Sequence, residues 1–199
     1  MRKFLSGIFK AVRKFSFALI LVMITVSASF GDATSDLFEA VRYENTTPER
    51  IYELIISGAK INAKNHDGYT ALMRAASVNT NPEIIRALII SEADVNAKDI
   101  RGYTALSRAV LNYSQSPEIV KMLIDAGADV NVKSKSGSTI LFQAAHDASN
   151  PNPEVIRILL EAGADISTKI LGGKTVLDYN LNDNIRKVIE EFITQRTGE

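Results

Sequence analysis

The chain has 199 residues, enough for one domain of ordinary size, and its 23 lysines and arginines balance its 23 aspartates and glutamates. It contains two histidines and no cysteine, which excludes a disulfide framework and lipid attachment through an N-terminal cysteine. A metal or nucleophile site would therefore have to be built almost entirely from carboxylates and hydroxyls.

Residues 1–31 predict a Sec-type signal peptide. Residues 1–15 carry five basic residues and no acidic one, and residues 15–26 are almost entirely apolar. A basic region before an apolar stretch too short to span a bilayer comfortably is typical of an export signal. The small residues that follow predict cleavage after Ala28 or after Gly31. An uncleaved anchor and an amphipathic segment lying on a membrane are the alternatives.

Cleavage would change the charge of the protein. Residues 1–31 hold five of the basic residues and none of the acidic ones, so residues 32–199 keep 18 basic and 23 acidic residues and a net charge of −5. A mildly acidic domain has no electrostatic reason to bind nucleic acid or an anionic membrane surface. We therefore expect no nucleic-acid partner, and no membrane attachment once the signal has been removed.

Three phrases recur along the remaining chain with one period. The first surrounds a glycine followed two residues later by threonine, the second is Pro-Glu after Thr, Asn or Ser, and the third is Val-Asn-Ala-Lys or a variant of it. Successive copies of the first two phrases lie 34, 35 and 36 residues apart, which predicts a structural repeat. The copies of the three phrases begin at Gly68, Gly102, Gly137 and Gly173, at Thr47, Asn81, Ser116 and Asn152, and at Ile61, Val95, Val130 and Ile166.

The residue pattern of each repeat predicts a tight turn at the glycine, followed by two helices. Before Pro-Glu, a Thr, Asn or Ser oxygen can cap free backbone N–H groups, proline suits the first helical position, and glutamate faces the positive end of the helix dipole. Apolar residues then recur at helical spacing, as in Ile84, Ile85 and Leu88, which predicts one buried face. The threonine after each turn glycine is placed to cap the shorter first helix.

Glycine marks the expected end of the second helix, where the backbone turns left-handed and a Cβ atom is unfavourable. Gly58, Gly127 and Gly163 occupy this position, whereas one repeat carries Glu92 there. We therefore predict a left-handed Glu92 with about 1 kcal/mol of local strain.

A turn, two antiparallel helices and a Gly-Ala-Asp-Val-Asn phrase, complete at Gly127–Asn131, resemble the ankyrin repeat. The resemblance implies an all-α ankyrin-repeat solenoid of helix-turn-helix units with short turn or β-hairpin tips. The usual Thr-Pro-Leu-His is missing, since Met73, Ser107, Phe142 and Asp178 replace its histidine. Within a domain of residues 32–199, the implied units are an N-terminal cap (35–64), three full repeats (65–98, 99–133 and 134–169) and a C-terminal cap (170–196).

The segment between the two helices lengthens from repeat to repeat, and with the Asn-Pro-Glu helix starts it resembles exported ankyrin proteins of bacteria. Together with the signal peptide, this resemblance suggests a periplasmic address. A protein released from the cell is the alternative. We expect a monomer, because both ends of the stack have caps.

Ankyrin proteins usually bind other proteins through a concave face made of turn tips and first helices, so the resemblance implies an interaction scaffold and no enzyme. Tyr69 and Tyr103 are equivalent residues, as are Arg74 and Arg108, and both types are enriched at interface hot spots. Alternatively, these tyrosines only brace the turns and the arginines bridge acids between repeats. The candidate partner-binding residues are Tyr69, Arg74, Ile100, Arg101, Tyr103, Arg108, Leu111 and Asn112.

The same pattern places Gln143 and His146 on the exposed side of the next first helix. We interpret His66 and His146 as solvated surface residues, and the repeated Asp94, Asp129 and Asp165 as loop-stabilising residues. The run at Gly172–Thr175 lacks the earlier glycine of a phosphate loop. We predict no catalytic, cofactor or metal site. The two functions that remain are a periplasmic protein-binding scaffold and a secreted effector or inhibitor that binds a protein outside the cell.

Overall fold

The computed structural model describes residues 32–197, apart from residues 79, 149 and 171. The predicted signal peptide and its two cleavage sites lie outside these residues. Within them the chain forms α-helices, one π-helical turn and one 3₁₀ turn. In chain order the elements are α3 (Ala33–Ala40), α4 (Pro48–Ile56), α5 (Ala71–Val78), α6 (Pro82–Ile90), α7 (Ala105–Leu111), α8 (Pro117–Asp125), α9 (Ile140–Phe142), η2 (Gln143–Asp147), α10 (Pro153–Glu161), η3 (Val176–Asp178) and α11 (Asp183–Thr197).

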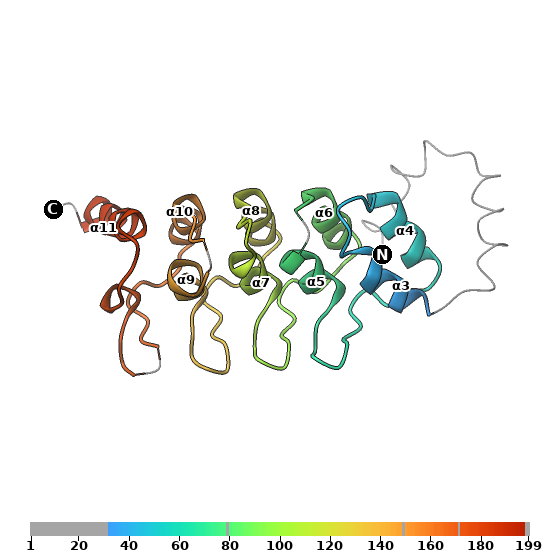
Figure 1. The fold of residues 1–199 in the computed structure, drawn as a ribbon, viewed down its shortest axis with the longest axis horizontal. Coiled ribbons are helices and arrows are strands. Elements are labelled where there is room, and N and C mark those ends of the chain that lie inside the picture. Colours follow the sequence, from blue (N-terminus) through green and yellow to red (C-terminus); the bar gives the residue numbers. More distant parts are fainter. Residues whose placement is uncertain (1–31, 79, 149, 171, 198–199) are drawn as a thin grey trace.

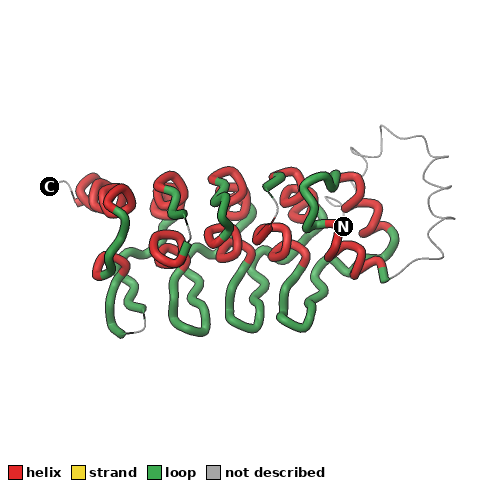
Figure 2. Tube along the Cα trace, viewed as in Figure 1, coloured by secondary structure: helices red, strands yellow, loops and turns green. Residues whose placement is uncertain are grey.

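The helices are arranged as a linear stack, which confirms the predicted all-α solenoid. Figure 1 shows the second helices α4, α6, α8 and α10 in one row and the first helices α5, α7 and α9 in a row beside it. Helix α3 packs on α4 at one end, and α11 packs on α10 at the other. The loops between repeats extend away from the second helices and lie in a row of their own (Figure 2).

These turn loops, defined here as residues 61–69, 95–103, 130–138 and 166–174 without residue 171, occupy equivalent positions in successive repeats, and backbone hydrogen bonds hold the first three against each other. The Ile100 N–H donates to the Asp67 carbonyl at 3.1 Å, and the Lys135 N–H donates to the Arg101 carbonyl at 2.9 Å. Gly102 has a φ of +81°, and a Cβ atom on it would lie 3.0 Å from the Lys135 nitrogen. Within the described residues the loops contain one isolated antiparallel bridge, Lys133 to Thr139, so their tips are hydrogen-bonded turns.

The predicted helix starts are confirmed. The Asn81 side chain accepts from the Glu83 N–H at 3.0 Å at the start of α6, and the hydroxyl of Thr104 accepts from the Ser107 N–H at 3.3 Å at the start of α7. Proline occupies the first turn of α4, α6, α8 and α10. These bonds satisfy backbone donors that the helices cannot pair themselves, so local sequence sets where each helix begins.

The apolar faces of the helices merge into one continuous core. Leu72, Ile84 and Leu88 are fully buried, as the helical spacing predicts. The cluster continues from Leu37 in α3 to Ile189 in α11 and joins every repeat to its neighbours. The two caps thus cover the apolar ends of the stack.

Asparagine side chains of the turn loops join consecutive repeats. Asn96 donates through Nδ2 to the Gly127 carbonyl at 2.9 Å and accepts from the Asp129 N–H at 2.9 Å. Asn62 and Asn131 make the same pair of bonds to the next repeat. We call these three residues the asparagine ladder. Asp94, Asp129 and Asp165 each accept from the N–H group two residues ahead, which gives them a role within their own loops.

The segment between α7 and α8 is held by a buried amide. Gln115 is 1% exposed, and its Nε2 donates to the Val110 carbonyl. Its Oε1 accepts from the Asn152 N–H at 2.6 Å, while its carbonyl accepts from the Asn152 side chain at 3.3 Å. Gln115 therefore ties the loop of one repeat to the residue that caps α10 in the next.

The first helix of the third repeat differs from its two predecessors. Helix α9 has three residues and continues as the π-helical turn η2, in which the Ala148 N–H donates to the Gln143 carbonyl at 2.9 Å. Part of the predicted loop extension is thus taken up inside the helix. The expectation that Gln143 is exposed is wrong, since Gln143 is fully buried and donates to the Ser138 carbonyl at 3.2 Å. Its side chain ends beneath its own turn, whereas the longer Arg108 side chain at the equivalent position extends to the tyrosines above it.

Glu92 has a φ of +66°, which confirms the predicted left-handed end of α6. Gly58, Gly127 and Gly163 have φ values of +99°, +91° and +91° at the equivalent positions. Replacing Glu92 with glycine is expected to raise the free energy of unfolding by about 0.5–1 kcal/mol, because relief of the Cβ strain exceeds the entropy that glycine adds to the unfolded chain. Urea denaturation measures the change. The matched substitution Gly127→Ala is expected to lower stability. A lower urea midpoint for Glu92→Gly than for the parent would contradict the predicted strain at Glu92.

Candidate protein-binding face

The candidate residues come from two adjacent repeats. Tyr69 and Tyr103 lie in the turn loops just before α5 and α7, which pack against each other. Ile100 and Arg101 lie at the tip of the second of these loops. Arg74 lies on α5, Arg108 and Leu111 lie on α7, and Asn112 ends α7.

Arg108 lies between the two tyrosines. Its guanidinium carbon is 4.4 Å from the ring centroid of Tyr69 and 4.6 Å from that of Tyr103. An arginine over an aromatic face is attracted by the ring's negative π cloud, and here one cation contacts rings from two repeats. The repeat pattern marks these three residues as candidates but does not predict that they touch. The contact joins one helix to two separate turns, which a comparison of equivalent positions cannot show.

Asp99 holds Arg108 from below. The two side chains form an ion pair, with the Asp99 side chain fully buried and the Arg108 side chain 13% exposed. The second Asp99 oxygen accepts from the N–H groups of Arg101 and Tyr103 at 2.8 and 2.9 Å. One carboxylate therefore shapes the turn and fixes the arginine. The Nε of Arg108 is buried and has no hydrogen-bond partner within the described residues.

We call Tyr69, Asp99, Tyr103 and Arg108 the tyrosine–arginine cluster. The contacts within this cluster match the alternative in which the tyrosines brace neighbouring turns instead of binding a partner. Both tyrosines nevertheless remain half-buried, so each presents part of its surface to solvent. Arg74, the equivalent of Arg108, makes no side-chain hydrogen bond or ion pair within the described part of the chain, so the two arginines differ in role.

The remaining candidates divide into packed and accessible residues. Asn112 donates through Nδ2 to the Ala76 carbonyl at 3.2 Å and so joins two repeats, and Leu111 packs against the core. Ile100, by contrast, is 54% exposed, and Arg101 beside it is exposed as well. Ile100 and Arg101 are therefore the candidates most exposed to a partner. Arg74 is half-buried, but its guanidinium has no hydrogen-bond or ion-pair partner among the described residues.

A second aromatic cluster lies toward the C-terminal end. The Phe142 and His146 rings are stacked with centroids 4.8 Å apart, and the Tyr179 ring meets them edge-on at 4.8 and 5.3 Å. Lys174 lies 5.6 Å from the centroid of Tyr179. His146 is exposed, as the sequence predicts, but it is stacked against other rings as well as solvated. The sequence does not reveal this cluster, because the π-helical turn that carries His146 follows no recognisable pattern.

Three titratable side chains in the described part of the chain have a displaced pKa, and each has a local cause. Hydrogen bonds from the hydroxyls of Ser167 and Thr168 lower the pKa of Asp165. The backbone N–H and hydroxyl of Thr175 lower the pKa of Asp178, while burial is the main cause of the raised pKa of Tyr52. The pKa shift of Asp178 thus arises at a helix cap, that of Asp165 in a loop and that of Tyr52 in a packed ring. Within the described residues, no group of three His, Asp or Glu side chains is placed to hold a metal ion.

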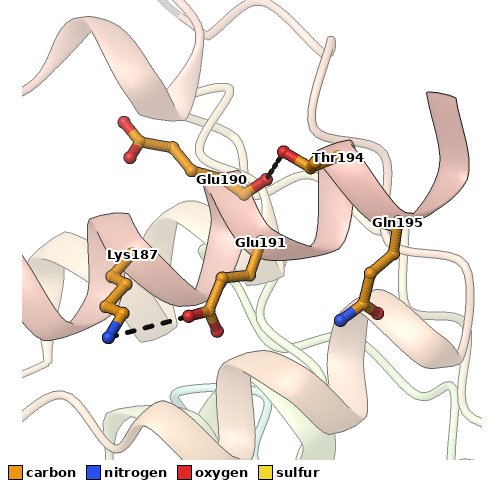
Figure 3. A pocket seen from close by; sticks show the side chains of 5 residues that line it. All are labelled: Lys187, Glu190, Glu191, Thr194 and Gln195. Atoms are coloured by element: carbon orange, nitrogen blue, oxygen red, sulfur yellow. Dashed lines mark hydrogen bonds and ion pairs between the residues drawn. The ribbon is translucent and has the colours of Figure 1, made fainter. Parts of the chain in front are cut away.

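A hollow of about 390 Å³ lies along α11 (Figure 3). Its described lining comes from one helix: Lys187 pairs with Glu191 at 3.7 Å, and the Thr194 hydroxyl donates to the Glu190 carbonyl at 3.0 Å. These polar groups already have partners, and the hollow contains none of the candidate residues. None of the helices in the described ranges is both long and apolar enough to cross a membrane.

Comparison with protein families identifies the repeats. Helix pairs that recur along the chain and stack through turn loops define a repeat protein with an extended surface. The family model of three ankyrin repeats matches residues 37–134 and 113–195, which is most of the chain. The chain therefore belongs to the ankyrin repeat family, whose members generally bind proteins and are typically not enzymes. Comparison with curated proteins gave no match.

Proposed function

We propose that the protein is a non-enzymatic scaffold of the periplasm, which binds a partner protein through the concave face of the stack. The proposed face is centred on the repeats at 65–98 and 99–133. The observation that carries the proposal is the exposed pair Ile100 and Arg101 beside the tyrosine–arginine cluster. Rings fixed in advance lose little conformational entropy on binding, and Tyr, Arg and an exposed apolar side chain are typical of interface hot spots.

The proposed location rests on residues 1–31. Five basic residues precede an apolar stretch and small residues at the expected cleavage sites, which is the pattern of an export signal. The mature protein would meet a partner that is itself exported or that projects from a membrane.

A pull-down from the envelope of the producing cell tests the proposed face. The test variant carries Arg74→Ala, Ile100→Ala and Arg101→Ala, and leaves the tyrosine–arginine cluster intact because that cluster holds the turns. The control carries Arg86→Ala, Ile90→Ala and Arg157→Ala, the same residue types at exposed positions of the second helices. We expect the test variant to recover about tenfold less of one specific protein, and the control to recover it as the parent does.

Circular dichroism establishes that both variants are folded. Equal recovery by the parent and the test variant would contradict the proposed face. A partner that is found only among proteins outside the cell would contradict the periplasmic location and support a secreted effector or inhibitor.

A further inference from the structure

Positive charge is concentrated in the turn loops. They carry seven lysines and arginines against two acids, whereas the rest of residues 32–199 carries 11 basic and 21 acidic residues. A domain with a net charge of −5 thus divides into loops at +5 and a remainder at −10. The seven cations, all of them exposed, are Lys64, Lys98, Arg101, Lys133, Lys135, Lys169 and Lys174.

These loop cations differ from those of the second helices in their pairing. Arg50, Arg86 and Arg157 each pair with a glutamate of their own helix, at 3.3, 3.1 and 2.8 Å. None of the seven loop cations has a carboxylate within 4.0 Å among the described residues. Asp94 and its equivalents, which lie just before the loops, accept hydrogen bonds from their own backbone. Lys133 attracts Asp165, and Lys169 and Lys174 attract Asp178, at longer range. No loop cation is thus held in a direct ion pair among the described residues, so these cations can still bind an acidic molecule.

The loops form one continuous row. Lys64, Lys98, Lys133 and Lys169 occur once per loop at equivalent positions, and the loops lie side by side (Figure 2). The Lys64 Nζ donates to the Lys98 carbonyl at 2.9 Å, so the row is closely connected at this point. Packed helices lie about 8–10 Å apart, which gives four loops a span of roughly 25–30 Å. An extended chain covers this distance with about eight or nine residues.

We propose that the partner of this protein docks on the turn loops through an extended acidic segment of about eight to ten residues, with an apolar side chain placed against Ile100. This inference rests on the proposed function and specifies the chemistry of the partner. A short acidic segment matches the length of the row. A long nucleic acid would extend past the row and meet the negative charge of the remaining domain, which opposes its binding.

Fluorescence anisotropy with defined probes tests the proposal. The probe is a fluorescein-labelled ten-residue peptide of nine glutamates and one central leucine, and the purified full-length protein is titrated into it at 50 mM NaCl. A peptide with glutamine in place of glutamate and a labelled ten-nucleotide oligothymidylate are the controls. We expect the acidic peptide to bind more tightly than either control, and its affinity to fall at least about tenfold at 500 mM NaCl.

Two variants of equal charge locate the binding. The loop variant carries Lys98→Gln, Lys133→Gln, Lys135→Gln and Lys169→Gln, and the helix variant carries Arg86→Gln, Lys121→Gln, Arg157→Gln and Lys187→Gln. We expect the loop variant to bind the acidic peptide about tenfold more weakly and the helix variant to bind it within about twofold of the parent. None of these positions is changed in the pull-down test variant, and the helix variant shares Arg86 and Arg157 with the pull-down control.

Several outcomes would overturn the proposal. Equal binding of the glutamine peptide would show that charge is not recognised, and equal loss in both variants would show an effect of net charge alone. Tighter binding of the oligothymidylate would assign the row to nucleic acid. If the acidic peptide fails to bind while the pull-down still loses its partner, the acidic segment is wrong and the proposed function stands. If both experiments fail, the proposed function fails as well.

Discussion

Replacing Arg108 with alanine is expected to lower the free energy of unfolding by about 3 kcal/mol, although the residue resembles an interface arginine. The change leaves the fully buried Asp99 carboxylate without its cation and removes the contact that joins Tyr69 to Tyr103. Asp99 keeps two backbone donors, which places the effect at the lower end of the range for a broken buried pair. Urea denaturation of the purified protein measures it.

Two controls separate this role from a general effect of losing arginine. Arg74→Ala, at the equivalent position of the preceding repeat, is expected to change stability by less than about 0.5 kcal/mol. Arg108→Lys keeps the charge but lacks the planar fork, so it is expected to recover only part of the loss. Equal stability of the Arg108→Ala and Arg74→Ala variants would contradict the bracing role.

Replacing Gln115 with alanine is expected to lower the free energy of unfolding by about 2–3 kcal/mol. The substitution leaves the Val110 carbonyl and the Asn152 N–H without their buried partner and opens a space beside them. It also loosens the residue that caps α10. Thermal unfolding followed by circular dichroism measures the shift.

Tyr113 provides the matched control, because it lies in the same segment and is 77% exposed. Tyr113→Ala is expected to leave the midpoint within about 1 °C of the parent. If both variants unfolded at the same temperature, the buried amide would not be what holds this segment.

The sequence predicts the helix starts and ends because the residues concerned act on their own backbone. Asn81 caps the helix that follows it, and Glu92 adopts the left-handed conformation that its place in the repeat requires. The recurrence of the same unit every 34 to 36 residues predicts in addition that successive units stack on each other. Local rules and repetition together were therefore sufficient to predict the all-α solenoid.

Contacts between side chains of different repeats could not be predicted in this way. A repeat copies structural and functional residues alike, so the recurrence of Tyr69 as Tyr103 does not reveal that Arg108 fills the space between them. Gln143 shows the same limit, because the burial of its position depends on how far the side chain reaches. The charge of the turn loops can be counted from the sequence, but its separation from the acids becomes apparent only once the loops are placed in a row.

The asparagine ladder also affects how the number of repeats can change. Each asparagine recognises one carbonyl and one N–H at a left-handed helix end, and every full repeat offers that same pair. A duplicated or deleted unit of 34 to 36 residues would therefore present matching junctions at both of its edges. The stack is modular, and each added module would extend the cationic row by one loop without redesign of its neighbours.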